Sequence, residues 1–460
     1  MACHESTRVL EHCRISPWPA SATEAGPLPL TFFDLLWLRR DDLVERLFLY
    51  PFPHTSPATT ATFTESYLPS LKSALSLTLR HFYPLAGRVR PTPGSSHRYE
   101  LHYTEGDSVL LTVAETDLDL LDLAGSHARE SYKFRPLVPP LPPEHPSDGG
   151  GGGGVGRPLL AVQVTVFPHR GIGVGITIHH VACDGAGFTH FVKSWASSSK
   201  SGGHFPLVVG DAPSFDRSVI ADPCNLYALF LGDGNTASAP PAAFAAAPLG
   251  QLVRATFTLG PDHIQGLKAT AAVGKKDGHS SSFHCSTFVV TCAFMWACIA
   301  KARGISSCRA DTKAHFGFMA DWRKRLQPPV PDAYFGNCVE MCPVEVEVGD
   351  LVQGDGVAVA AEAIGRVIQG LTRGVSECLA GFREKFLTVV ASGCPVLGAI
   401  SSPKFKVYDV DFGWGRPLKV EVVSLGAGAI CLSDSGEVRG GVEVGVVLPK
   451  HEMEALATQF

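Results

Sequence analysis

Two segments near the middle of the chain have the alternation that is typical of strands in contact with a core. Residues 159–167, LLAVQVTVF, and 171–179, GIGVGITIH, are rich in valine and isoleucine, and the short turn PHRG separates them. This arrangement predicts a β-hairpin. In the second segment every second residue is isoleucine or valine, so these side chains share one face. The same period places His180 on that buried face and His179 on the other, which predicts that His180 is the interior histidine.

Helical spacing is found in three other segments. In 70–82, SLKSALSLTLRHF, apolar residues recur every three or four positions, which predicts a helix that the proline of YPLAG ends. The segment 186–197 has the same spacing, and the polar run SSSKSGGHFP after it is expected to be a linker. The segment 281–303 predicts a buried helix, because its apolar run 287–300 is shorter than the ~20 residues needed to cross a bilayer. Strands are expected around KVEVVSL, AICLS and GVEVGVVL near the end of the chain.

Helices and strands are mixed in both halves of the chain. Helices that alternate with strands carrying one apolar face indicate an α/β or mixed α+β protein. With 460 residues the chain can form more than one domain with its own core. We predict two domains, 1–205 and 226–460, joined by a linker at 206–225. The stretch 136–156 is rich in proline and then glycine, and we expect a surface loop there because neither composition builds a packed element.

Composition and charge exclude several classes of partner. Hydrophobic residues make up 45% of the chain and charged residues 18%, which is typical of a globular protein. The formal net charge of −5 provides no basic field that would attract nucleic acid or an anionic membrane. The first residues lack the apolar core of a secretory signal, and the 13 cysteines show no metal-binding spacing. We therefore expect a cytoplasmic protein with reduced thiols that has no nucleic-acid, membrane or metal partner.

The polar groups with candidate chemistry follow the second strand, in HHVACDG. His180 at a strand end could be a general base, because neutral imidazole accepts a proton near pH 7; a core histidine satisfied by hydrogen bonds is the alternative. Asp184 could assist this histidine or cap the helix that follows. A zinc site made of the two histidines, Cys183 and Asp184 is disfavoured, because four ligands within six residues cannot easily surround one ion.

Two short motifs carry a resemblance to a known family. His180 and Asp184 form an HxxxD motif, and DFGWG follows far downstream at 411–415. The pair resembles the signatures of the plant BAHD acyl-CoA-dependent acyltransferases. A kinase would also contain DFG, but no HRDLxxxN lies upstream and Arg-Pro follows DFGWG. YFGNC at 334–338 is similar to the clade that acts on anthocyanins, flavonoids and other phenolic glucosides, and the similarity extends along nearly the whole chain.

The resemblance implies a fold, a reaction and a co-substrate. It implies two similar domains related to chloramphenicol acetyltransferase, with the active site in a channel between them. His180 would remove the proton of a sugar hydroxyl as this hydroxyl attacks the thioester of acyl-CoA. Asp184 would shape the loop by pairing with Arg323 instead of reacting. We expect no bound cofactor, acyl-CoA as co-substrate, and a monomer whose partners are the small-molecule acyl-CoA donor and a glycoside acceptor.

The resemblance also suggests residues that surround the reaction. Residues expected to support the site are Gly185, Asp411, Gly413 and Gly415. Trp414 could donate its indole N–H to the oxyanion or line the channel. Candidate contacts for CoA, whose phosphates favour cations and helix N-termini, are Ser286, Thr287 and Lys404.

The donor and the mechanism leave alternatives open. The clade suggests malonyl-CoA, and a hydroxycinnamoyl-CoA such as coumaroyl-CoA is the alternative. A malonyl group carries a free carboxylate and should need a cation near its pocket, but the sequence does not assign one, as the helix after the motif offers only His190 and Lys193. Cys183 could first accept the acyl group as a thiolate. A catalytically silent homologue is a further alternative, which the intact His180, Asp184 and DFGWG disfavour.

Overall fold

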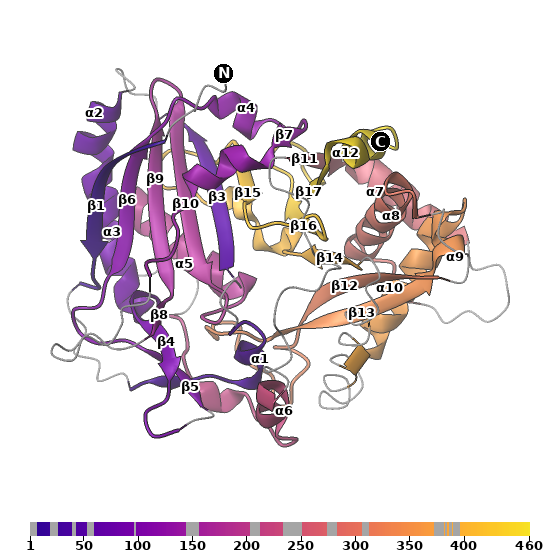
Figure 1. The fold of residues 1–460 in the computed structure, drawn as a ribbon, viewed down its shortest axis with the longest axis horizontal. Helices are drawn as coiled ribbons and strands as arrows, with labels where there is room; N and C mark the ends of the chain where they lie inside the picture. The colour runs from indigo at the N-terminus through magenta and orange to yellow at the C-terminus, as the bar shows by residue number, and fades with distance from the viewer. Residues whose placement is uncertain are drawn as a thin grey trace.

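The structure is a computed structural model of the chain. It describes residues 7–18, 26–38, 43–52, 59–95, 98–143, 156–202, 212–232, 251–273, 283–305, 312–371, 381, 384–385, 389 and 396–460. Two large sheets lie side by side with helices packed against them (Figure 1). The glycine run of the predicted loop at 136–156 and the first residues of the predicted linker at 206–225 lie outside the described residues.

The first sheet has six strands in the order β1-β6-β9-β10-β3-β15. Its strands are β1 (Arg8–Ile15), β3 (Leu43–Pro51), β6 (Val109–Glu115), β9 (Leu160–Phe167), β10 (Gly171–His179) and β15 (Lys419–Val422). The predicted hairpin is confirmed, because β9 and β10 pair antiparallel with Ile172 opposite Val166. Helices α3 (Leu68–His81) and α5 (Gly185–Lys200) bury their apolar faces in one core with this sheet.

The two helices of the first half differ in how well the sequence predicted them. The helix expected at 70–82 is confirmed as α3, whose predicted face, Leu71, Leu75, Leu79 and Phe82, is fully buried. The prediction that 186–197 is followed directly by a linker was wrong, because α5 continues to Lys200 and Gly202 follows in a left-handed conformation, φ 66. The last turn is held by tertiary contacts, since Ser199 Oγ donates to the Phe412 carbonyl at 3.2 Å.

The second sheet has seven strands in the order β13-β12-β14-β16-β17-β11-β7. Its strands are β7 (Arg129–Glu130), β11 (Leu252–Leu259), β12 (Lys313–Asp321), β13 (Val339–Glu347), β14 (Val396–Ile400), β16 (Ala429–Asp434) and β17 (Val442–Pro449). Helices packed in this half are α7 (Pro261–Val273), α8 (Thr287–Ala302), α9 (Val348–Val352), α10 (Gly356–Gly370) and α12 (Lys450–Ala457). The predicted buried helix and the three predicted terminal strands are confirmed as α8 and as β15, β16 and β17.

Each large sheet contains a strand from the other half of the chain. β15 pairs with β3, with Val422 opposite Arg46, and Figure 1 shows the yellow β15 beside the indigo and magenta strands. In return, β7 pairs with β11 of the second sheet. Backbone hydrogen bonds therefore tie the two halves together on both sides. The division into domains at 206–225 stays a prediction.

Shorter elements surround the region where the halves meet. A four-stranded sheet, in the order β2-β5-β4-β8, contains β2 (Leu28–Pro29), β4 (Arg88–Pro91), β5 (Tyr99–His102) and β8 (Arg157–Pro158). Short helices are α1 (Phe32–Leu35), α2 (Thr60–Thr62), η1 (Phe63–Tyr67), η2 (Tyr83–Ala86), α4 (Leu120–Ala124), η3 (Ser131–Leu137), η4 (Arg217–Val219), α6 (Leu226–Gly232), η9 (Pro403–Phe405) and η10 (Val407–Asp409).

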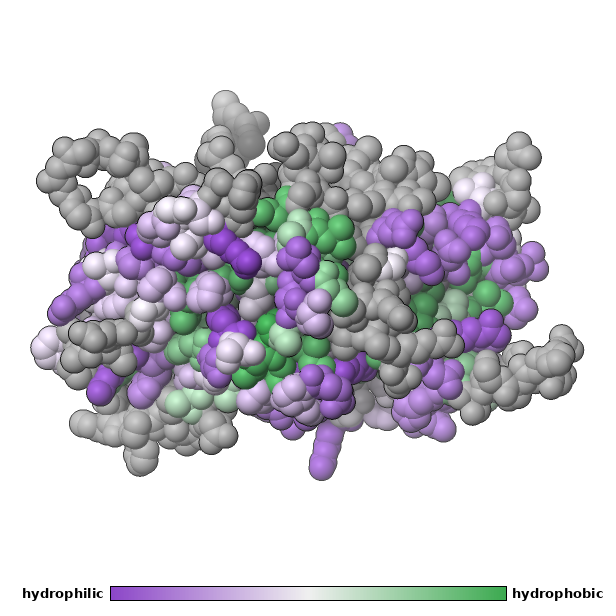
Figure 2. Space-filling view, turned by 90° about the horizontal axis from the view of Figure 1, so that it is seen from below, coloured by the Kyte–Doolittle hydropathy of each residue, from purple (hydrophilic) through white to green (hydrophobic). Residues whose placement is uncertain are grey.

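Figure 2 shows apolar residues at the surface in the middle of one face, beside hydrophilic ones. No described helix is both long and apolar enough to cross a bilayer.

Candidate active site

The two adjacent histidines differ in a way that strand alternation did not predict. β10 ends at His179, so His180 already belongs to the turn before α5. His179 is 1% exposed, whereas His180 is partly exposed. The prediction that His180 is the interior histidine was wrong, because both faces of β10 are covered. On the face opposite the isoleucines, a Cβ on Gly175 would lie 2.1 Å from the Leu137 carbonyl.

His179 is buried and neutral. Its Nδ1 accepts the backbone N–H of Val181 at 3.3 Å. Burial, together with the nearby Arg157 and His180, lowers the pKa of His179 to about 3. The ring therefore supports the turn through an acceptor and does not take part in proton exchange near pH 7.

His180 lies between an aromatic ring and an amide. Its ring stacks on Trp37, with the ring centroids 3.7 Å apart and the planes 10° from parallel. Its Nδ1 lies 3.2 Å from Oδ1 of Asn337. Burial lowers the pKa of His180 below its ordinary value, although its own backbone carbonyl, Asp184 and Asn337 oppose this effect. The ring is thus neutral near pH 7, which is the state a general base requires.

The orientation of Asn337 assigns the tautomer of His180. The amide nitrogen of Asn337 faces three acceptors: Oδ1 of Asp34 at 3.0 Å, the His180 carbonyl at 2.9 Å and the Val181 carbonyl at 3.3 Å. The amide oxygen must therefore face the ring, and it can only accept, so Nδ1 of His180 carries the hydrogen. The hydrogen-bond network thereby leaves the lone pair on Nε2.

Asp34 holds Asn337 in this orientation. The carboxylate is fully buried, and its Oδ2 accepts the backbone N–H and the hydroxyl of Thr31 at 2.7 and 2.8 Å. Its Oδ1 accepts the backbone N–H of Asn337 at 3.1 Å as well as the side-chain amide. The TFFD sequence at the start of α1 is a variant of the capping box, in which the acidic residue reaches back to the first residue. A local capping pattern thus fixes Asp34, and hydrogen bonds then lead from Asp34 through Asn337 to His180.

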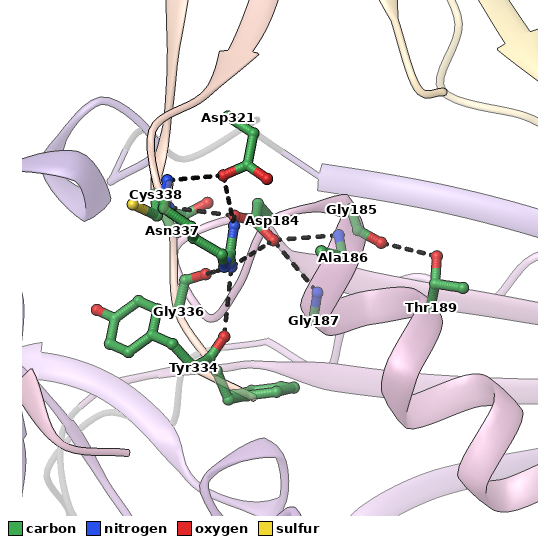
Figure 3. Close-up of polar contacts among 12 residues, drawn as sticks. Asp184, Gly185, Ala186, Gly187, Thr189, Asp321, Tyr334, Gly336, Asn337 and Cys338 are labelled. Carbon is green, nitrogen blue, oxygen red and sulfur yellow. Dashed lines mark hydrogen bonds and ion pairs between the residues drawn. The ribbon is translucent and has the colours of Figure 1, made fainter. Parts of the chain in front are cut away.

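Asp184 uses its carboxylate in a different network (Figure 3). The ion pair expected with Arg323 is present and bidentate, at 2.7 Å to Oδ2 and 3.1 Å to Oδ1. Oδ1 also accepts the N–H groups of Ala186 and Gly187 at 3.1 and 3.2 Å, as the N-cap of α5. Oδ2 accepts the N–H of Cys338 at 3.1 Å. Burial alone would lower the pKa of Arg323, but Asp184 raises it above its ordinary value.

Two buried arginines hold the backbone of the YFGNC segment. Arg323 donates to the carbonyls of Tyr334 and Gly336, each at 3.3 Å. Arg217 donates to the carbonyl between them, that of Phe335, at 2.7 Å. Because these carbonyls directly precede Asn337, the arginines fix the segment that delivers the amide to His180. This is a physical role for YFGNC that the motif alone does not reveal.

DFGWG lies at the opposite end of α5 from the histidine. Asp411 pairs with Lys200, the last residue of α5, at 2.6 Å. Its other oxygen accepts the N–H groups of Gly413 and Gly415, both at 2.8 Å. Both glycines have left-handed backbone angles, φ 98 and 91, which side chains rarely adopt. Since α5 has 16 residues, this end lies about 24 Å from its start.

Trp414 belongs to an aromatic cluster at that far end. Its ring meets Tyr50, Phe63 and Tyr67 edge to face, with centroids 5.5, 6.0 and 6.5 Å away. Tyr50 also donates its hydroxyl to the Val410 carbonyl at 3.0 Å. The structure does not bring Trp414 beside His180, so the predicted contact with the oxyanion has no support from its surroundings. Asp411, Gly413 and Gly415 shape this cluster and not the turn around His180.

The remaining predicted residues fall into two groups. Ser286 caps α8, accepting the Val289 N–H at 3.3 Å, and Thr287 is the first residue of that helix. Lys404 is exposed in η9. The same short helix packs on the start of α5, where a Cβ on Gly185 would lie 2.7 Å from the Phe405 ring. No group of three or more His, Cys, Asp or Glu among the described residues is arranged to hold a metal ion.

A sequence model of the Transferase family matches residues 13–460. The chain belongs to this family, the BAHD acyltransferases. Malonyl-coenzyme A:anthocyanin 3-O-glucoside-6''-O-malonyltransferase of Dahlia pinnata is 37% identical over 98% of this chain and 96% of its own length. Phenolic glucoside malonyltransferase 1 of Arabidopsis thaliana is 34% identical over 98% and 96%. Coumaroyl-CoA:anthocyanidin 3-O-glucoside-6''-O-coumaroyltransferase 1 of Arabidopsis thaliana is 35% identical over 99% and 97%. The predicted family and acyltransferase class of this BAHD enzyme are confirmed.

Solved structures agree on the fold. Vinorine synthase has a TM-score of 0.70 at 21% identity, covering 99% of this BAHD chain and 97% of its own. F. graminearum TRI101 complexed with coenzyme A and T-2 mycotoxin has a TM-score of 0.65 at 17% identity, covering 94% and 97%. The predicted mixed fold is confirmed.

Three residues around His180 were not predicted from the sequence: Trp37, Asp34 and Asn337. Asn337 lies inside YFGNC, but its partners are distant in the sequence.

Proposed function

We propose that this enzyme transfers an acyl group from an acyl-CoA, with malonyl-CoA as the preferred donor, to a sugar hydroxyl of an anthocyanin, flavonoid or other phenolic glucoside. The observation that carries the proposal is the chain from Asp34 through Asn337 to Nδ1 of His180, which leaves Nε2 unprotonated. The named activities of the relatives supply the substrate classes.

The proposed mechanism is a direct transfer with His180 as general base. Nε2 takes the proton of the sugar hydroxyl while the oxygen attacks the thioester carbonyl carbon, and a tetrahedral oxyanion forms. The C–S bond then breaks, and the proton on Nε2 passes to the leaving sulfur, so that the acylated sugar and free CoA result. Proton transfer of this kind contributes about 10² to 10⁴ in rate. The stacking on Trp37 keeps the ring plane fixed through both proton transfers.

Asp184 supports the site without touching the reacting atoms in this proposal. Each of its two oxygens already accepts donors from Arg323 and from backbone N–H groups. Its carboxylate is therefore occupied by the start of α5 and by the YFGNC segment. We assign it the role of holding the turn that carries His180 against Asn337.

Cys183 is unsuited to an acyl-cysteine intermediate. The side chain is 2% exposed, and burial raises its pKa well above the ordinary value of a thiol. A thiolate is the nucleophilic form, so Cys183 stays protonated and out of contact with substrate. This supports transfer through a ternary complex.

A coumaroyl or other hydroxycinnamoyl donor is the second candidate. A named coumaroyltransferase is nearly as similar to this chain as the malonyltransferases are, at 35% identity against 37%. The overall similarity therefore does not separate the two donors. We further propose that the enzyme is a cytoplasmic monomer. Size-exclusion chromatography with light scattering would check the monomeric state.

The test is an assay of the purified full chain with malonyl-, acetyl- and coumaroyl-CoA against a panel of anthocyanin, flavonoid and simple phenolic glucosides. We expect a malonylated glucoside as the main product, identified by its mass and by fragmentation that places the acyl group on the sugar. Acylated product from aglycones but not from glucosides would contradict the acceptor class. Absence of any transfer at equal enzyme and donor concentrations would overturn the proposal.

A further inference from the structure

A buried arginine in the first sheet has no carboxylate partner among the residues that the structure describes. Arg46, on β3, is 4% exposed, and its Nε is buried without a hydrogen-bond partner. Its Nη2 donates to Oγ of Ser401 at 3.4 Å. In the part of the chain that the structure describes, no aspartate or glutamate forms an ion pair with it or acts on its pKa.

Of the other four buried arginines among the described residues, three form an ion pair with a carboxylate, and the fourth, Arg217, donates to the Phe335 carbonyl and lies within the electrostatic influence of Asp34. Arg129 and Arg254 lie 2.9 and 3.3 Å from Glu421. Arg323 is paired with Asp184, as described above. Burying an uncompensated cation is costly, because the charge loses its hydration. Arg46 combines an unused donor with the lack of any described carboxylate that pairs with it or acts on its pKa, so an anion from outside the described protein would neutralise it.

The surroundings of Arg46 offer no substitute for that anion. Cys431 is an ionisable neighbour, and burial raises the pKa of its thiol, so that it carries no negative charge near pH 7. On another side, the guanidinium carbon lies 5.2 Å from the ring centroid of Phe188. An arginine between an aromatic ring, a hydroxyl and a neutral thiol is suited to bind a small carboxylate through two parallel N–H donors.

Arg46 lies close to the turn that carries the candidate base. It is opposite Ile176 of β10, whereas His179 is opposite Leu43. His179 therefore lies about 10 Å along the strand from the level of Arg46, and the candidate base His180 is the next residue, a gap that the arginine side chain and a three-carbon acyl group can span together. Phe188 belongs to the first turn of α5, and Ser401 follows β14 in the segment that leads to η9.

We propose that Arg46 binds the free carboxylate of a dicarboxylic acyl group, and so selects malonyl-CoA among the acyl-CoA donors. The inference rests on the proposed function, which it deepens by naming the cation that the donor needs. It also predicts discrimination against hydroxycinnamoyl donors. Their aromatic ring would cover the guanidinium without neutralising it, and a buried unpaired charge is an effective barrier to the wrong ligand.

The test compares donors that differ in the carboxylate. Arg46→Met and the wild-type full chain are assayed with malonyl-, succinyl- and acetyl-CoA and one glucoside acceptor. We expect the ratio of kcat/KM for malonyl-CoA to kcat/KM for acetyl-CoA to fall by about 10- to 100-fold, mainly through KM, since hydrogen bonds to charged groups have this strength. An equal loss for both donors would overturn the inference, because Arg46 would then act on CoA or on the fold.

Two controls separate recognition of the donor carboxylate from other effects of the substitution. Lys404→Met removes an exposed cation from the neighbouring segment and is expected to leave the ratio between the donors unchanged. Thermal unfolding of Arg46→Met without ligand should show equal or higher stability, because replacing an unpaired buried charge by an apolar side chain removes its desolvation cost. A clear fall in Tm would assign Arg46 a structural role and overturn the inference.

Failure of the inference and failure of the proposed function give different results. Wild-type enzyme that malonylates a glucoside, with an unchanged donor ratio in Arg46→Met, overturns the role of Arg46 alone. If the kcat/KM of the wild-type enzyme for acetyl- or coumaroyl-CoA equals that for malonyl-CoA, the role of Arg46 is also overturned, while acyl transfer stands. Titration calorimetry of malonyl- and acetyl-CoA with both proteins makes the same comparison without turnover, and equal affinities in the wild type would overturn the inference even if no acceptor reacts.

Discussion

The two ends of α5 contact the same two halves of the chain through different kinds of interaction. At its start, buried charges and amides from Asp34, Arg323 and Asn337 surround a turn with a partly exposed histidine. At its far end, Trp414 packs in an aromatic cluster, and the ion pair between Asp411 and Lys200 lies at the surface. Both ends are fixed by contacts between the halves, but the start also presents a nitrogen with an unused lone pair. Both motifs therefore help to hold the helix, and only the one at its start also prepares a base.

The largest expected effect is at the histidine. His180→Ala should lower kcat by about 10² to 10⁴, because the variant lacks the base that takes the hydroxyl proton in the proposed mechanism. The measurement is the steady-state rate with malonyl-CoA and a glucoside acceptor. Thermal unfolding should change little, because the ring is partly exposed and its main partners belong to a network that remains paired. Full activity in this variant would refute the role of His180.

The buried pair at the start of α5 is expected to contribute more than the exposed pair at its end. Asp184→Asn leaves Arg323 as a buried cation that keeps the exposed Asp321, at 3.3 Å, but loses its buried carboxylate partner, which should lower the free energy of unfolding by about 3–5 kcal/mol. Lys200→Met is the matched control and should cost less than about 1 kcal/mol, because Lys200 is exposed. Urea unfolding of both variants measures the difference. Equal losses would contradict the distinction between the two ends.

The aromatic cluster should affect stability more than chemistry. Trp414→Leu removes a large side chain from the contacts with Tyr50, Phe63 and Tyr67 and should cost about 2–4 kcal/mol in unfolding free energy. Activity per folded molecule should fall far less than in His180→Ala. Denaturant titration and kcat measured below the unfolding transition separate the two quantities. A loss of kcat as large as that of His180→Ala would place Trp414 at the reaction.

The smallest expected effect concerns the amide that orients the base. Transfer requires neutral His180, whose pKa lies below its ordinary value, so kcat/KM should be constant above neutral pH and fall only as the pH drops through that lowered pKa. Asn337→Ala removes an acceptor that favours the protonated ring, so the fall should move to still lower pH while the plateau drops by about tenfold. Rate profiles from pH 5 to 9 test this. An upward shift of the midpoint would contradict the assignment of Asn337.

The outcome of the sequence predictions depended on how local each feature is. The spacing that predicts α3 and the alternation that predicts the β9–β10 hairpin are local and were confirmed. Strand alternation failed to tell His179 from His180, because η3 covers the second face of β10 and removes the contrast between buried and exposed. The end of α5 was predicted too early, because Ser199 and Lys200 of its last turn are held by Phe412 and Asp411, more than two hundred positions away.

The sequence by itself determined the family, the fold class and the identity of the candidate base, because short motifs and hydrophobic periods encode them locally. Only the tertiary structure decided which atoms surround that base. The amide of Asn337, the carboxylate of Asp34 and the ring of Trp37 come from segments that meet across the two halves. It also separated Arg46, which lacks a carboxylate, from the arginines that have one. Compensation of a buried charge is a property of three-dimensional neighbours, and strand or helix periodicity does not report it.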